Sequence, residues 1–253
     1  TEKEMMTWKA EARFLRAFYY YRLLILNGPV VFLGDELVDF NLDNIDMADR
    51  SPWSTIVDWV CDEFDLAAKD LPEDQGDYYL GRATKGAALA YKAKLLLYSA
   101  RPLFNGQNGT HIYDNMYNHY GEKLFATEYD PTKWERAAKA CQDVIDMNYY
   151  ALENDKTLDP VANYHNLFDK MKTSETIFCR ILGGNIVQHT MPSRIGLTNS
   201  YGGVSLTQKI VDYFPMANGY WPINNLEDET YNNGVGDIII EPRSGYTESG
   251  SKS

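Results

Sequence analysis

Two groups of aromatic residues fall in segments rich in glycine and asparagine, outside any helical pattern. They are Tyr113, Tyr117 and Tyr120 in the first group, and Tyr201, Tyr220 and Trp221 in the second. A flat aromatic ring can cover the apolar face of a sugar, while a nearby amide such as Asn199 hydrogen-bonds the sugar hydroxyls. We interpret these residues as candidates for carbohydrate binding. The alternative is that each ring packs on the scaffold with its hydroxyl hydrogen-bonded.

Residue types that support catalysis are present but are not arranged for it. A glycosidase needs two carboxylates about 5 to 9.5 Å apart across a cleft, whereas Asp62, Glu63 and Asp65 are interpreted as a solvated helix face. The histidines are scattered and form neither HExxH nor a His-acid-Ser arrangement: His111, His119, His165 and His189. The cysteines, Cys61, Cys141 and Cys179, lack CxxC spacing. We therefore expect no enzyme activity, no metal and no cofactor.

The composition restricts the partners of the chain. Its 253 residues include 36 acidic and 24 basic side chains, for a net charge of -12 at pH 7. Such a field repels phosphate backbones, so nucleic acid is not an expected partner. No apolar run approaches the roughly 18 residues of a membrane-spanning helix.

Apolar periodicity predicts four main helices, near residues 4–26, 53–71, 83–100 and 132–147, packed as two antiparallel pairs. In the first, one apolar stripe recurs at spacings of three and four: Met5, Trp8, Ala12, Leu15, Tyr19, Leu23 and Leu26. Trp8 and Tyr20 lack obvious cover. In the second helix, Val60 and Phe64 are expected in the core. In the fourth, the inward positions are expected to be Trp134, Ala137, Ala138, Cys141, Val144 and Ile145.

The remaining segments are expected to be irregular. Residues 101–132 form a loop longer than compact domains usually contain. Beyond residue 150 we expect a strand near 176–182 and a short helix near 207–214. The spacing of Val60, Phe64 and Pro72, which recurs at Ala137 and Cys141, is typical of tetratricopeptide repeats, although any amphipathic helix can show it.

Four segments, in order, resemble the hallmarks of the SusD/RagB family of outer-membrane glycan-binding lipoproteins. They are EARFLRA at 11–17 followed by Gly28, GRATKGAA at 81–88, Trp134 with Val144-Ile145-Asp146, and LTQKIVD at 206–212 with Phe214, Met216 and Gly219. Leu206 replaces the proline that is usual in the last segment. In the family an aromatic residue just ahead of that segment is a ligand platform, and Tyr201 occupies this place.

The resemblance implies a mainly α fold of tetratricopeptide-like helix pairs, an α-α superhelix, with a loop-rich, irregular binding face. We expect a single SusD-like domain over 1–253, helical in 1–150 and loop-rich in 151–253. Family members have further segments at both ends, so the chain is expected to be incomplete and to lack the lipid anchor.

The resemblance also implies a function without catalysis. Glycan would be bound on the outward-facing surface of the outer membrane and delivered to a SusC-like TonB-dependent transporter. The alternatives are a peptide cargo, as in RagB-like members, or a helical-repeat interaction scaffold.

Overall fold

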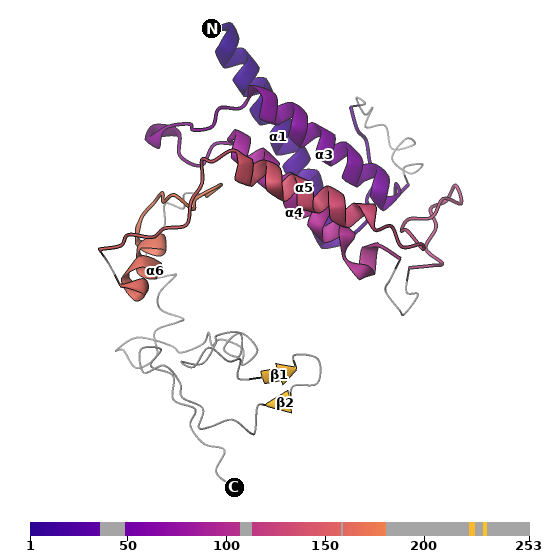
Figure 1. Ribbon diagram of the computed structural model, residues 1–253. Helices are drawn as coiled ribbons and strands as arrows, with labels where there is room; N and C mark the ends of the chain where they lie inside the picture. The colour runs from indigo at the N-terminus through magenta and orange to yellow at the C-terminus, as the bar shows by residue number, and fades with distance from the viewer. Residues whose placement is uncertain (36–48, 107–112, 158, 181–222, 226–229, 232–253) are drawn as a thin grey trace, which may run out of the picture. The chain divides into compact units, whose positions relative to one another are not determined.

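The computed structural model describes residues 1–35, 49–106, 113–157 and 159–180, together with the strand residues 223–225 and 230–231 (Figure 1). The chain divides into two compact units, residues 1–181 and 182–253. In the second unit, β1 (Ile223–Asn225) pairs antiparallel with β2 (Thr230–Tyr231). The helix predicted at 207–214 lies outside the described residues.

The first unit is helical, which confirms the predicted mainly α class. Its helices are α1 (Glu2–Asn27), α3 (Trp53–Asp70), α4 (Lys85–Ala100), α5 (Thr132–Asp146) and α6 (Pro160–Asp169), with 3-10 turns η1 (Asp77–Tyr79) and η2 (Pro102–Phe104). The four main helices begin and end within two residues of the predicted bounds. Among the described residues, no helix is both long and apolar enough to cross a membrane.

Local chemistry explains where these helices begin and end. Thr1 and Glu4 form a capping box at the start of α1, and Gly28 ends the helix at a φ of +71°. The Thr84 side chain accepts a hydrogen bond from the amide of Ala87 at 3.2 Å and caps α4. These signals involve residues close in sequence, so the helix boundaries could be predicted well.

The four main helices alternate in direction and lie side by side (Figure 1). The amide of Lys85, at the start of α4, donates to Pro72 O after the end of α3, at 2.9 Å. The amide of Trp53, at the start of α3, donates to Leu124 O ahead of α5, also at 2.9 Å. Helix α1 packs mainly on α3, α3 on α4, and α4 on α5, and α1 also contacts α4.

The core lies where α1, α3 and α4 meet. Val60 and Phe64 of α3 are buried, as predicted. The ring of Phe14 lies 5.7 Å from that of Phe64 and 5.4 Å from that of Phe178. Small residues on α4, including Ala87, are buried and allow close approach of the neighbouring helices.

The apolar stripe identified on the first helix is exposed. Trp8 is 58% exposed and Leu15 is 45% exposed, whereas the buried residues of α1 are Ala10, Phe14, Ala17, Tyr21 and Leu24. Helix α1 therefore has two apolar faces, and in the described part of the chain its partners cover only one. The expectation that Tyr20 lacks cover is wrong, because its ring packs against those of Phe32 and Trp59, which also contact each other.

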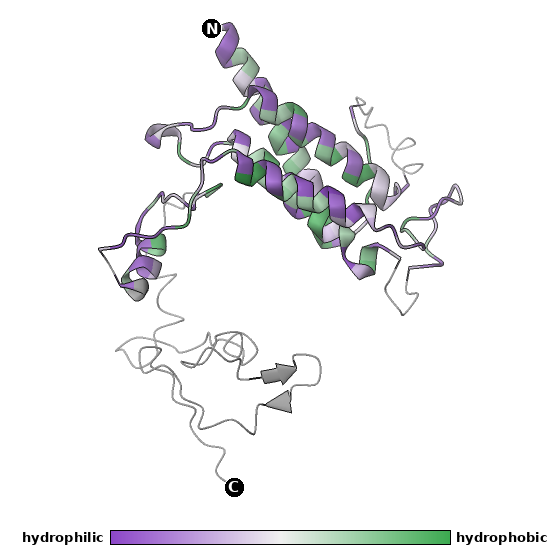
Figure 2. Cartoon of the chain, in the orientation of Figure 1, coloured by the Kyte–Doolittle hydropathy of each residue, from purple (hydrophilic) through white to green (hydrophobic). Residues whose placement is uncertain are grey.

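Two further expectations are corrected in the first unit. In α5, Ala137 and Ala140 are buried, but Trp134 and Ile145 are exposed, because α5 packs against α4 along a narrow line of small residues. Figure 2 shows hydrophobic and hydrophilic residues mixed along the visible side of this helix. The strand predicted from residue 176 does not form over 176–180.

Charged residues of the hallmark segments form ion pairs between different elements of the fold. The guanidinium of Arg82, from GRATKGAA, donates to both carboxylate oxygens of Glu11, from EARFLRA. Arg13 and Arg16 donate to the two oxygens of Glu63 at 2.7 and 2.6 Å. Glu63 is 3% exposed, so its interpretation as part of a solvated face is wrong. Glu63 therefore has a structural role, because its carboxylate links α3 to α1.

Candidate functional site

The aromatic residues of the first candidate group differ in their surroundings. Tyr113 is half-buried, and its ring stacks on that of Phe125 with the centroids 4.2 Å apart. Tyr117 and Tyr120 are exposed. Their loop is shaped by Asn118, whose side-chain oxygen accepts hydrogen bonds from the amides of Tyr120 and Glu122. Tyr117 and Tyr120 thus keep free surface, while Tyr113 shares one ring face with the core.

The second candidate group lies outside the described residues. It comprises Asn199, Tyr201, Tyr220 and Trp221. Ligand contact by either group stays a prediction.

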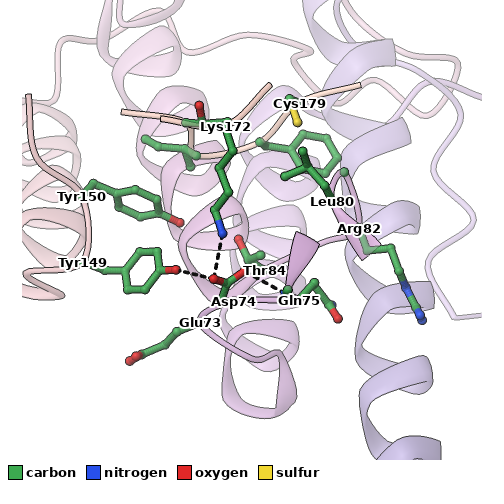
Figure 3. A pocket seen from close by; sticks show the side chains of 15 residues that line it. Glu73, Asp74, Gln75, Leu80, Arg82, Thr84, Tyr149, Tyr150, Lys172 and Cys179 are labelled. Carbon is green, nitrogen blue, oxygen red and sulfur yellow. Dashed lines mark hydrogen bonds and ion pairs between the residues drawn. The ribbon is translucent and has the colours of Figure 1, made fainter. Parts of the chain in front are cut away.

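A pocket with Asp74 among its lining residues forms where three segments of the first unit meet (Figure 3). They are the turn between α3 and α4, the residues directly after α5, and residues 172–179. Asp74 lies at its centre: Lys172 Nζ and Tyr149 Oη donate to its Oδ2 at 2.7 and 2.9 Å. The amide of Gly76 donates to its Oδ1 at 2.9 Å, an Asx-type turn that Gly76 permits at a φ of +72°.

These donors stabilise the charged form of Asp74. The hydrogen bond from Lys172, followed by those from Gly76 and Tyr149, lowers the pKa of Asp74 from 3.8 to about 2. The hydrogen bond from Lys172 to Asp74 raises the pKa of Lys172, and the one from Tyr149 to Asp74 raises the pKa of Tyr149. Because the folded pKa is depressed, the contribution of Asp74 to stability is complete only above about pH 5 and is lost progressively as the pH falls through 3.8 toward 2.

We expect the side-chain carboxyl carbon of Asp74 to titrate in NMR with a midpoint near pH 2, since its three donors must release it before it is protonated. Lys172→Met should move the midpoint toward 3.8, and Tyr149→Phe should move it by less. Lys139→Met, at an exposed lysine whose partner is Asp143, is the control. A wild-type midpoint at 3.8 would show that these donors do not hold Asp74.

Tyr150 is held by a different set of contacts. Burial of its ring raises the pKa of the Tyr150 hydroxyl above its usual value. The hydroxyl lies over Gly86, where an added Cβ would be only 2.0 Å away. Any residue larger than glycine at position 86 would therefore clash with Tyr150 in its present position.

Replacing Gly86 with alanine should destabilise the fold by about 1 to 3 kcal/mol, because Tyr150 must leave its place. In a Tyr150→Ala background the same replacement should instead stabilise by about 0.4 to 1 kcal/mol, the usual gain for an unobstructed Gly→Ala change. Urea unfolding of the four proteins measures both changes. An identical effect of Gly86→Ala in the two backgrounds would refute the contact.

The arrangement offers hydrogen-bonding groups and ring faces, and Cys179 also lines the pocket. Burial raises the pKa of the Cys61 thiol to about 12, which leaves it protonated and unreactive at neutral pH. Among the described residues, no group of three or more His, Cys, Asp or Glu side chains is placed to hold a metal ion.

A signal for this region was present in the sequence. Tyr149 and Tyr150 are adjacent aromatics directly after the predicted end of the fourth helix, and like the other candidate residues they lie outside a helical pattern. Asp74 gave no such signal, because its partners Tyr149 and Lys172 are 75 and 98 residues away.

Comparisons with known proteins bear on the fold. No family model matches the sequence, and no curated protein matches it. Among solved structures, BT4246 is 27% identical with a TM-score of 0.73, over 95% of this chain and 49% of that chain. A SusD-like protein of Bacteroides fragilis NCTC 9343, BF3747, is 21% identical with a TM-score of 0.62, over 87% of this chain and 38% of that one.

This chain has a SusD-like fold. The likeness confirms the resemblance seen in the hallmark segments, and the helix pairs of the first unit agree with it. The chain spans about half the length of BT4246, and less than half that of the SusD-like protein BF3747.

Proposed function

We propose that the chain is part of a SusD-like protein that binds glycan on the outward face of the outer membrane, without cleaving it. It passes the glycan to a SusC-like TonB-dependent transporter, and a lipid anchor holds the protein at the membrane. The observation that carries the proposal is the SusD-like fold, which extends over most of the chain and agrees with the order of the hallmark segments.

The exposed aromatics support glycan binding. Tyr117 and Tyr120 present free ring surface on a loop of fixed shape. Rings of this kind can stack on the apolar face of a sugar. Tyr201, with Asn199, Tyr220 and Trp221, remains the proposed centre of the site, because it occupies the place of the family's ligand platform.

We expect Tyr201→Ala to weaken glycan binding at least several-fold in calorimetric titration, while thermal stability stays unchanged. A stacked ring contributes on the order of 1 kcal/mol, and about 1.4 kcal/mol is a tenfold change in Kd. Tyr78→Ala is a matched control, since Tyr78 is 90% exposed in η1. Equal losses of stability and binding would mark Tyr201 as a core residue instead.

The same samples separate the competing functions. Incubation with the bound glycan should yield no cleavage products, and reproducible products would favour a glycosidase. Binding of peptides without any glycan would favour the RagB-like alternative.

A further inference from the structure

An open groove adjoins the Asp74 pocket and shares Tyr149, Tyr150, Lys172 and Thr176 with it. The pocket itself leaves only about 30 Å³, enough for one or two water molecules. The groove offers about 390 Å³, within the range of about 300 to 1,000 Å³ for small-molecule sites. A ligand the size of a sugar unit therefore fits the groove but not the pocket.

One wall of the groove consists of two tyrosine rings that are held in place before any ligand arrives. The rings of Tyr149 and Tyr150 lie edge to face, with centroids 5.1 Å apart and planes at 81°. The hydroxyl of Tyr149 is held by its hydrogen bond to Asp74 (Figure 3), and Tyr150 lies close against Gly86. Tyr149 is nevertheless 38% exposed. Its ring is thus available for stacking, and binding would cost little side-chain ordering.

The other wall is polar, and its charges are paired. Lys172 pairs with Asp74 at 2.7 Å, and Lys170 with Glu153 at 3.1 Å. The hydroxyl of Ser174 donates to Glu153 at 2.9 Å. An anionic ligand would have to compete with these carboxylates for the lysines. A ligand that exchanges hydrogen bonds without bringing charge fits this wall better.

We propose that this groove is a second ligand site, which binds a neutral pyranose unit with one sugar face stacked on Tyr149. The sugar hydroxyls are within the reach of the carboxylate of Glu153, the ammonium of Lys170 and the hydroxyl of Thr173, which also lines the groove. The inference rests on the proposed function, because it takes glycan as the ligand class. It differs from the Tyr201 site in its residues and in its place in the chain.

The test uses Lys170 as a reporter within the groove, since its side chain is 50% exposed. The 253-residue chain is incubated with neutral hexasaccharides of glucose, mannose or xylose, and with an acidic oligogalacturonide. Lysine methylation is then followed by mass spectrometry. We expect a neutral hexasaccharide to slow methylation of Lys170 at least threefold, and the acidic one not to. Lys139, 79% exposed, should react unchanged.

Variants of Tyr149 test whether its ring is responsible for the protection of Lys170. Tyr149→Ala should raise the saccharide concentration for half-protection of Lys170 at least fivefold. Tyr149→Phe, which keeps the ring, should change it less than twofold. Tyr78→Ala and Tyr201→Ala should leave it unchanged.

The possible failures are distinguishable. If a neutral saccharide binds but leaves Lys170 unprotected, or if Tyr149→Ala has no effect, the groove proposal is overturned and the proposed function stands. If no saccharide binds, both the groove proposal and the proposed function are overturned. Protection of Lys170 by a peptide mixture and by no saccharide would overturn the assignment of the ligand class.

Discussion

Replacing Phe14 with alanine should destabilise the chain by about 3 to 5 kcal/mol, the usual cost of deleting a fully buried aromatic ring. Phe14 is fully buried, and its ring contacts those of Phe64, Tyr91 and Phe178. The alanine would leave a cavity between α1, α3 and α4, because the surrounding rings can collapse only partly. Urea unfolding of the 253-residue chain measures the loss.

The neighbouring residue is the matched control. Leu15 belongs to the exposed stripe of α1, so Leu15→Ala should change the free energy of unfolding by about 0.5 kcal/mol or less. Together the two variants test which apolar face of α1 is buried. A larger loss of stability for Leu15→Ala than for Phe14→Ala would mean that the face of α1 that includes Leu15 is the buried one.

Replacing both Arg13 and Arg16 with methionine should also cost about 3 to 5 kcal/mol, because Glu63 would remain buried without a cationic partner. Arg13→Met alone should cost less, since Arg16 still donates to Glu63 Oε2 at 2.6 Å. Urea unfolding at pH 7 measures these changes.

A triple variant separates the lost ion pair from the lost packing of the arginine side chains. Adding Glu63→Leu to the double replacement should recover most of the stability, because an apolar trio of similar volume removes the unpaired charge. Unchanged stability of the double variant would mean that Glu63 is not buried. Absence of recovery in the triple variant would attribute the loss to packing instead.

The helices and their bounds could be predicted from the sequence because the signals are local. Spacings of three and four residues predict the helices, and the Thr1 and Thr84 caps and Gly28 mark their ends. The hallmark segments also predicted the SusD-like fold.

The tertiary structure decided which face of α1 is buried. That helix carries apolar residues on two faces, and periodicity alone does not distinguish the one with partners. The rings of Phe64, Tyr91 and Phe178 surround Phe14, so the face that includes Phe14 forms the core.

The partners of the polar residues Glu63 and Asp74 likewise depend on the tertiary packing. In the sequence, Glu63 is one of several acidic residues on a helix, and Arg13 and Arg16 lie 50 and 47 residues away. Asp74 and Tyr149 are 75 residues apart, yet their side chains meet at 2.9 Å. The helices and the kind of fold therefore follow from local sequence signals. The buried ion pairs and the tyrosine groove depended on long-range packing, because no local pattern records which distant side chains meet.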